Sequence, residues 1–202
     1  MLKNSNFFLI GPMGSGKTTI GRQLARSMKK SFHDSDHEIE DHTGASISLI
    51  FDIEGEEGFR TREKAIIDEL TQQDNIVLST GGGVILDIEN RKNLKDRGTV
   101  IYLHASLKKL FYRTSRDKKR PLLQTEDPRE KLRQIVEERD PLYRQTADLI
   151  VETEGRTVPQ VVSYIIRQVQ TGQKQTGSNQ KITKPIKNPK KKSNKKKGSG
   201  KK

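Results

Sequence analysis

An eight-residue segment rich in glycine, residues 11–18, has the composition of a phosphate-binding loop. It reads Gly-Pro-Met-Gly-Ser-Gly-Lys-Thr and fits the pattern G-x-x-x-x-G-K-[ST]. Glycines let the backbone point its N–H groups at an anion, and the helix that follows directs its positive end there. We expect Lys17 to span the β- and γ-phosphates of ATP and the Thr18 hydroxyl to ligate Mg²⁺. The nucleotide contacts are predicted at Gly14, Ser15, Gly16, Lys17, Thr18 and Thr19.

Two carboxylates follow at Asp34 and Asp36, at the end of a second short strand. Residues i and i+2 of a strand point to one face, so both can face the cleft above the loop. One carboxylate could then lie near the metal while the other accepts a proton from an attacking hydroxyl. A plainer interpretation is that Asp36 caps the following helix and Asp34 is solvated, and the pattern alone leaves both open.

Two further segments carry residues of chemical interest. Arg60 and Glu63 lie three apart beside an amphipathic helical pattern, a spacing that by itself favours a surface ion pair. The glycines 81–83 follow an apolar strand. The carboxyl ends of parallel strands are where open α/β sheets bind ligands. The glycines therefore either let a ligand approach the backbone or form a simple connector.

Taken together and in this order, these segments resemble shikimate kinase. The resemblance spans residues 5–170 and is carried by the phosphate-binding loop, Asp34 with Asp36, Arg60 with Glu63, and the segments 80–83 (Thr-Gly-Gly-Gly), 120–123 (Arg-Pro-Leu-Leu) and 141–144 (Pro-Leu-Tyr-Arg). It implies transfer of phosphate from ATP, with Mg²⁺, to the 3-hydroxyl of shikimate. The products would be ADP and shikimate 3-phosphate, in the biosynthesis of chorismate and the aromatic amino acids.

The resemblance also assigns roles to single residues. It implies that Asp36 is the catalytic base and contacts shikimate hydroxyls, and that Asp34 lies near magnesium, through water. The implied shikimate-binding residues are Asp36, Arg60, Gly82 and Arg144. The arginine that reaches the ATP phosphates from a lid is implied to be Arg120, so that Lys17, Asp36 and Arg120 form the catalytic set. Beside the adenine the resemblance implies Arg113 and Arg156.

Short apolar runs alternate with amphipathic stretches, which is typical of an α/β fold with a parallel sheet. Strands are expected at 6–10, 31–33, 75–79, 99–103 and 148–151. An acidic cap at Asp127 before Pro128 predicts one helix, and the segment starting at Thr157 predicts the last one. The resemblance implies a P-loop NTPase-type three-layer sandwich with five parallel strands and a lid loop at about 115–127.

The charge of the chain is concentrated at one end. The 202 residues carry a net charge of +13, but residues 171–202 contain 12 lysines and no acid, which leaves the first 170 residues at +1. We therefore expect a kinase domain at 1–170 and a disordered lysine-rich tail at 171–202. The tail could bind nucleic acid or anionic membrane non-specifically, bind an acidic partner, or only increase solubility.

The composition excludes several kinds of site, and the motifs leave other functions as alternatives. With no cysteine, the chain has no disulfide or thiolate site, and no apolar run is long enough to span a membrane. We expect a cytoplasmic monomer with no sequence-specific nucleic-acid partner. The cluster of His33, His37 and His42 among acids lacks the spacing of a known metal site. Alternative functions are another P-loop kinase, for gluconate or nucleotides, and a non-catalytic nucleotide-binding protein.

Overall fold

The computed structural model describes residues 6–115 and 125–175 as a five-stranded sheet covered by helices. The strands are β1 (Phe7–Ile10), β2 (Ser31–Asp34), β3 (Ile76–Ser79), β4 (Thr99–His104) and β5 (Leu149–Glu152). All neighbouring pairs are parallel, and the strand order is β2-β3-β1-β4-β5. The five strands expected from the sequence are confirmed, each to within one or two residues.

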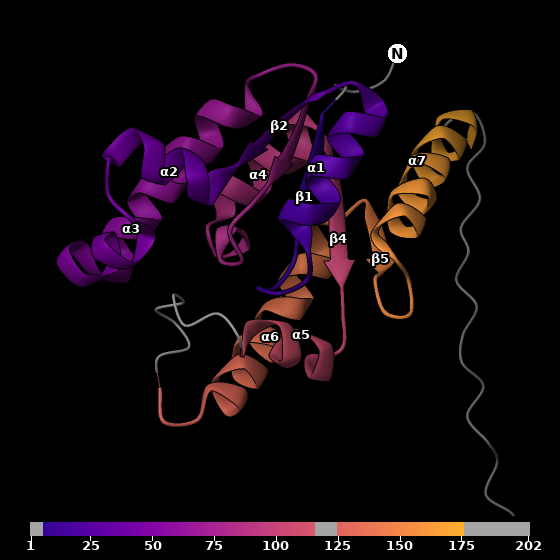
Figure 1. The fold of residues 1–202 in the computed structure, drawn as a ribbon. Helices are drawn as coiled ribbons and strands as arrows, with labels where there is room; N and C mark the ends of the chain where they lie inside the picture. The colour runs from indigo at the N-terminus through magenta and orange to yellow at the C-terminus, as the bar shows by residue number, and fades with distance from the viewer. Residues whose placement is uncertain (1–5, 116–124, 176–202) are drawn as a thin grey trace, which may run out of the picture.

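The helices form a layer on each face of the sheet (Figure 1). The helices α1 (Lys17–Met28) and α7 (Val158–Gln175) pack together on one face. The other face is covered by α2 (Ser35–Thr43), α3 (Ile47–Thr71), the short 3-10 helix η1 (Val84–Leu86), α4 (Ile88–Arg97) and α6 (Pro128–Thr146). The helix α5 (Leu107–Thr114) packs on α6 in a small cluster of its own. The predicted three-layer α/β architecture is confirmed.

The central strand β1 shows why the sheet is buried on both sides. Phe8 and Ile10 belong to the core beneath α3, whereas Phe7 and Leu9 belong to the core beneath α1 and α7. This alternation follows from the two-residue period of a strand. Because both faces are covered, the strand reads as a continuous apolar run, and each such side chain contributes roughly 1.5–3 kcal/mol on burial.

The long helix α3 bends at Gly55, whose φ of 71° and ψ of −173° are not helical. A positive φ of this kind is accessible to glycine at little cost, which explains the residue at this position. The guanidinium of Arg62 spans the bend and pairs with Glu54 at 2.6 Å. Arg60 and Glu63 therefore lie in the part of α3 that follows the bend, together with the amphipathic pattern that the sequence shows.

The helices α6 and α7 begin where the sequence predicts. The Asp127 carboxylate accepts hydrogen bonds from the backbone N–H groups of Arg129 and Glu130 and so caps α6. The helix α7 buries an apolar stripe against the sheet, formed by Val161, Val162 and Ile165. Its described residues run to Gln175.

Two of the sequence predictions fall outside the described residues. Most of the proposed lid, including Arg120, lies in residues 116–124, and most of the lysine-rich tail lies in residues 176–202. Within residues 6–115 and 125–175, no helix is both long and apolar enough to cross a membrane.

Candidate active site

The phosphate-binding loop joins β1 to α1 and adopts a conformation that requires glycine. Gly14 has a φ of 78° and Gly16 a φ of 97°, both in the left-handed region, and Gly16 directly precedes the first residue of α1. The ammonium group of Lys17 folds back onto this loop, donating to the carbonyl of Gly11 at 2.7 Å and to that of Pro12 at 3.0 Å. The loop therefore places a buried cation beside the N-terminus of a helix.

A cavity of about 440 Å³ opens above this loop. Most of the residues that the sequence nominated line it, from four separate parts of the chain: Gly14, Ser15, Gly16, Lys17, Thr18, Thr19, Asp34, Asp36, Gly82 and Arg113. Ser79 and Thr80, at the end of β3, line it as well. The fold thus brings the predicted phosphate-binding residues and both carboxylates to one cavity at the carboxyl end of the sheet.

Asp34 connects the two helices that begin at this cavity. The Thr18 hydroxyl donates to Asp34 Oδ2 at 2.7 Å, and Asp34 Oδ1 accepts from the backbone N–H of Asp36 at 3.2 Å. Asp34 is therefore the cap of α2, while Asp36 lies in the first turn of that helix. The plainer interpretation, with Asp36 as the cap and Asp34 solvated, is wrong. Asp34 ends β2 as expected, but Asp36 lies on the helix and not on the strand.

Three oxygen atoms at the floor of the cavity fit a magnesium site. The Thr18 hydroxyl lies between Asp34 Oδ2 and the Ser79 hydroxyl, 3.4 Å away. Hydroxyl and carboxylate oxygens are the ligands that Mg²⁺ prefers, with the remaining positions left to water and phosphate. Ser79 lies at the end of β3, a position at which many P-loop proteins carry an acid. Thr18 would therefore ligate the metal directly, and Asp34 would act through Thr18 or water.

Side chains from α2 and α3 lie against the glycines after β3. We call this part of the cavity the acceptor side, because a phosphate acceptor would bind there, and the phosphate-binding loop the donor side. The N–H of Gly81 donates to Ser35 Oγ at 2.9 Å, which ties the start of α2 to this loop. A Cβ atom at Gly81 would lie 2.6 Å from Glu63 Oε1 and 2.9 Å from Asp36 Oδ1, and one at Gly83 would overlap the Arg60 guanidinium. The segment is therefore a close-approach site, where a larger residue at either position would displace the Glu63, Asp36 or Arg60 side chain.

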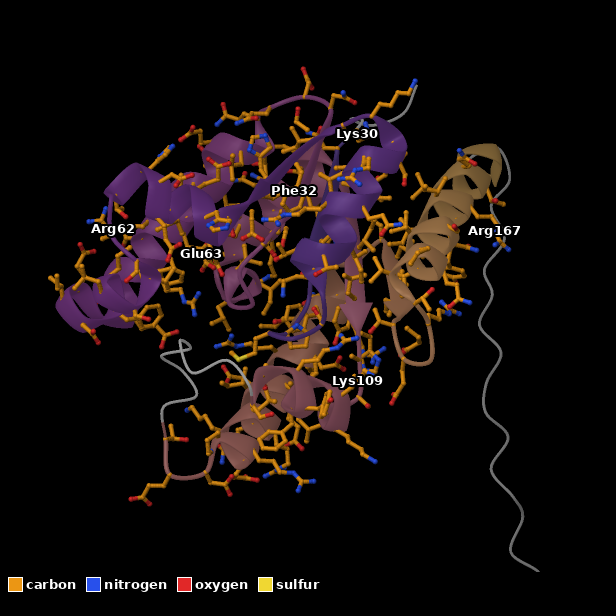
Figure 2. All side chains as sticks on the ribbon, in the orientation of Figure 1. Lys30, Phe32, Arg62, Glu63, Lys109 and Arg167 are labelled. Atoms are coloured by element: carbon orange, nitrogen blue, oxygen red, sulfur yellow. The ribbon has the colours of Figure 1, made fainter. Side chains whose placement is uncertain are left out.

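Glu63 is a buried carboxylate, not half of a surface ion pair. Its side chain is 1% exposed, and Oε2 accepts from the Arg60 guanidinium at 2.6 Å. Figure 2 shows Glu63 on the inner side of α3, whereas Arg62 points outward. Burial raises the pKa of Glu63 above its ordinary value, although Arg60 partly offsets this. Its second oxygen, Oε1, makes no hydrogen bond with any described residue.

Arg139 is the main site residue that the sequence interpretation missed. It lies on the inner face of α6, is 5% exposed, and its Nη1 donates to the carbonyl of Gly82 at 3.2 Å. Tyr143, one turn later, donates its hydroxyl hydrogen bond to the same carbonyl. Arg139 Nε is buried and has no partner among the described residues. The available signal was the position of Arg139 on the apolar face of its helix.

Arg144, by contrast, lies away from this cluster. Its Nε donates to Asp140 Oδ2 at 2.6 Å, and the side chain is 46% exposed. The hydroxyl of Tyr102 donates to the other Asp140 oxygen at 2.7 Å. Burial alone would raise the pKa of Asp140, but these two hydrogen bonds hold it below its ordinary value. Arg144 therefore belongs to a hydrogen-bond network with Asp140 and Tyr102. It does not take part in the contacts that converge on Gly82.

The nucleotide-side arginines occupy different positions. Arg113, at the end of α5, donates to the carbonyl of Gly14 at 2.9 Å and lines the cavity. Arg156 is exposed, and its guanidinium lies 4.6 Å from the centre of the Tyr164 ring. It is two residues from Val158, which does line the cavity. Arg120 belongs to the residues that the structure does not describe.

The histidines that suggested a transition-metal site have other partners. His33 Nδ1 lies 2.7 Å from Glu38 Oε1, and His37 lies 3.7 Å from a Glu40 oxygen. Across the described ranges, no group of three histidine or acidic side chains is close enough to hold a metal ion.

Comparisons with known proteins identify the family of this chain. The sequence model of the family described as "Shikimate kinase" matches residues 13–170. Shikimate kinase of Nitrosococcus oceani is 57% identical over 166 residues, 82% of this chain and 87% of that protein. Shikimate kinase of Legionella pneumophila (strain Corby) is 58% identical over 167 residues, 83% of this chain and 95% of that protein.

Among solved structures, a shikimate kinase resembles this chain more closely than a gluconokinase does. Shikimate kinase from Acinetobacter baumannii in complex with shikimate superposes with a TM-score of 0.81 at 48% identity, covering 83% of this chain and 93% of that one. A gluconokinase from Sinorhizobium meliloti shares only the fold, at 14% identity and a TM-score of 0.50. Family match, identity and coverage together show that this chain belongs to the shikimate kinase family, whose members are ATP-dependent kinases.

Proposed function

We propose that the protein transfers the γ-phosphoryl group of ATP to the 3-hydroxyl of shikimate in the cavity between the phosphate-binding loop and Gly82. Family membership supports the reaction, and the arrangement of side chains supports the roles below. The substrate is a small carboxylate with three hydroxyls, so its site needs cationic forks at one end and hydrogen-bond acceptors at the other. Both kinds of group converge on the glycines after β3.

One observation carries the acceptor assignment. Arg139 Nε and Glu63 Oε1 are buried polar atoms without a hydrogen-bond partner among the described residues, and both belong to side chains that adjoin the glycine segment. Buried polar groups are rarely left unsatisfied in a folded protein, because each costs about 1–3 kcal/mol. A bound carboxylate accepting from Arg139 and Arg60, with a hydroxyl donating to Glu63, would satisfy them.

This assignment replaces Arg144 with Arg139 as the second arginine for the substrate carboxylate. The two lie five residues apart on α6, but only Arg139 contacts Gly82. The Arg60 guanidinium is held in place by Glu56 at 2.8 Å and Glu63 at 2.6 Å. A guanidinium fixed in this way loses little conformational freedom when it binds a carboxylate, so the site is preorganised.

Asp36 is the proposed base. Its carboxylate lies against Gly81, and its backbone is tied to Asp34. From there it can accept the proton of the attacking hydroxyl, while Lys17 and the N-terminus of α1 stabilise the charge on the transferred phosphoryl group. The chain thus supplies a base on one side of the reacting atoms and an anion site on the other.

The magnesium ion is proposed to bind at Thr18, with Asp34 acting through water. When bound, it supplies Lewis-acid stabilisation of the phosphate oxygens. The Thr18 hydroxyl uses its proton on Asp34, which leaves its lone pairs directed elsewhere and available to a cation. Asp34 therefore both orients the Thr18 hydroxyl and caps α2.

The remaining roles rest on the family resemblance. Arg113 is proposed beside the nucleotide, consistent with its contact to Gly14, and Arg156 beside the adenine. Arg120 is proposed to reach the ATP phosphates. We also propose that the enzyme acts as a monomer in the cytoplasm.

A coupled assay of ADP release tests the proposed function. Shikimate, gluconate and nucleoside monophosphates are offered in turn at saturating Mg-ATP, and shikimate alone is expected to stimulate ADP release far above background hydrolysis. Phosphorus NMR of the product should then show a phosphate monoester on the 3-hydroxyl. Stimulation by gluconate or a nucleotide, with none by shikimate, contradicts the proposal.

A further inference from the structure

Three side chains from one stretch of α6, residues 139–143, connect this helix to the sheet and to the glycines after β3. Arg139 and Tyr143 both donate to the carbonyl of Gly82. The carboxylate of Asp140 instead accepts from the hydroxyl of Tyr102 on β4, at 2.7 Å. Because the three residues belong to little more than one helical turn, any rotation of α6 about its axis would move the three contacts together.

The backbone of α6 lacks a hydrogen bond in this same stretch, because Pro141 lies inside the helix. Proline has no N–H, so the bond that residue 141 would otherwise donate to the carbonyl of Glu137 is missing, and the proline ring crowds that carbonyl. The affected turn carries Arg139 and Asp140. Side-chain contacts therefore supply rigidity that the backbone of this turn does not.

Tyr102 lies between the two sides of the cavity. Its side chain is fully buried, and its ring stacks on that of Tyr143 with 4.9 Å between the ring centres. A Cβ atom at Gly11 would lie 3.4 Å from Tyr102 Cδ2, so the ring also adjoins the phosphate-binding loop. Burial raises the pKa of both tyrosine hydroxyls above the ordinary value, so both remain hydrogen-bond donors at neutral pH. A shift of the Tyr102 ring would therefore move Tyr143 as well.

Each oxygen of the Asp140 carboxylate has a different partner. Oδ1 accepts from Tyr102, and Oδ2 accepts from Arg144 Nε at 2.6 Å. The Asp140 side chain is 28% exposed and that of Arg144 46%, and an ion pair at such a surface contributes little to stability by itself. Its effect is geometrical, because two bonds from different directions hold the carboxylate in one orientation towards the Tyr102 hydroxyl.

We propose that Asp140 is a positioning residue for shikimate binding: through Tyr102 it holds α6 in the rotation that places Arg139 on the Gly82 carbonyl. The inference rests on the proposed function, because Arg139 is the proposed ligand of the shikimate carboxylate. Removing the Asp140 contact leaves the base and both arginine forks in the chain and shifts only the position of one fork. The KM for shikimate should therefore rise while the turnover number changes little.

The test compares Asp140→Ala with Asp140→Asn in steady-state kinetics of ADP release by the full-length chain. The alanine variant removes the acceptor of the Tyr102 hydroxyl, whereas the asparagine variant keeps an amide oxygen there. For Asp140→Ala we expect KM for shikimate to rise about 3–10-fold, the contribution of one hydrogen bond, with turnover and KM for ATP within about twofold. Asp140→Asn should restore KM for shikimate to within about twofold of the unmodified chain. The matched control, Glu138→Ala, removes an exposed carboxylate from the same helix and should leave all three constants unchanged.

Tyr102→Phe tests the path from Asp140 to the site. This variant keeps the ring that stacks on Tyr143 and removes only the hydroxyl. KM for shikimate should rise as much as in Asp140→Ala. The double variant Tyr102→Phe/Asp140→Ala should be no worse than either single variant, because all three lack the same hydrogen bond.

An unchanged KM for shikimate in Asp140→Ala would overturn the proposal, as would equal impairment of the asparagine or the control variant. Multiplied effects in the double variant would also overturn it. So would a loss of turnover or of ATP affinity as large as the change in KM for shikimate, since that indicates general damage to the fold.

The melting temperature reports the folding of each variant. If Asp140→Ala is unfolded at the assay temperature, Tyr102→Phe is compared with Glu138→Gln by the same criteria. Absence of shikimate-dependent ADP release in the unmodified chain is a separate result, because it overturns the proposed function itself and this inference with it.

Discussion

The donor side and the acceptor side of the cavity are built in different ways. The donor side consists of one continuous loop, residues 11–18, whose backbone and two side chains supply most of its polar groups. The acceptor side is assembled from the start of α2, the second half of α3, the glycines after β3 and the inner face of α6. A local site is fixed by its own sequence, whereas an assembled site depends on the packing of several elements.

The two sides also differ in how they hold charge. Lys17 donates hydrogen bonds to backbone carbonyls, which cannot change their protonation state. On the acceptor side, the buried Glu63 and Arg139 lie beside the partly buried Arg60, so this side holds a group of ionisable side chains. Substitutions and changes of pH should therefore act mainly on shikimate binding and leave nucleotide binding nearly unchanged. The predictions below test this contrast, beginning with the largest expected effect.

The largest effect is expected from Asp36→Asn, which removes the proposed base where the two sides meet. Turnover should fall by on the order of 10²-fold or more, because general-base catalysis typically contributes this much. The affinity for ATP, measured by fluorescence titration with a nucleotide analogue, should stay within about twofold. Unchanged turnover would remove Asp36 from the role of base, and a parallel loss of ATP affinity would show that the two sides are not separable.

A matched pair of variants, Arg139→Lys and Arg144→Lys, tests the correction on α6. Each keeps the positive charge but loses the planar fork that binds a carboxylate at two points. For Arg139→Lys we expect KM for shikimate to rise by about 10–100-fold, since a hydrogen bond to a charged group contributes about 1.5–3 kcal/mol. Arg144→Lys should change it less than about threefold. The opposite ranking in steady-state kinetics would restore Arg144 to the site.

A pH-dependent effect on stability is expected from Glu63. Because its pKa is raised in the folded protein, the folded state binds the proton more tightly than the unfolded state. The contribution of Glu63 to stability is therefore present at low pH and is lost as the pH rises through the raised pKa. The melting temperature of the unmodified chain, minus that of Glu63→Gln, should decrease between pH 4.5 and pH 8. A difference that is constant or increases with pH contradicts this interpretation.

The smallest effect is expected from deleting residues 176–202, which leaves all of α7 in place. Both KM values and the turnover number should change by less than about twofold, because the deleted segment lies outside the family match. Steady-state kinetics at 150 mM salt provide the measurement. A large increase in KM for either substrate would mean that this segment contributes to one side of the cavity.

The sequence predicted the fold and the donor side almost completely. Five apolar runs became the five strands, and the loop pattern placed the predicted residues at one cavity. Both signals are local: a strand shows its burial in consecutive residues, and the loop contains its own geometry. The division of the chain at residue 170 stays a prediction.

The acceptor side was predicted only in part, since its contacts join residues far apart in the chain. Spacing correctly paired Arg60 with Glu63 but could not reveal that the pair is buried, because burial comes from the Gly81–Gly83 segment. On α6, nothing in the sequence favours the arginine on the apolar face, Arg139, over the arginine next to Tyr143, Arg144, as a ligand of the substrate carboxylate. Only packing shows that Arg139 faces Gly82 and that Arg144 faces Asp140.

The folded-back ammonium of Lys17 has a consequence for each catalytic cycle. Its hydrogen bonds to two carbonyls of its own loop lower the cost of several kcal/mol that an isolated buried charge carries. Engagement of a triphosphate is then an exchange of partners, in which phosphate oxygens take over from peptide oxygens. Net nucleotide affinity is a difference between two sets of contacts, so product can leave without stranding the lysine.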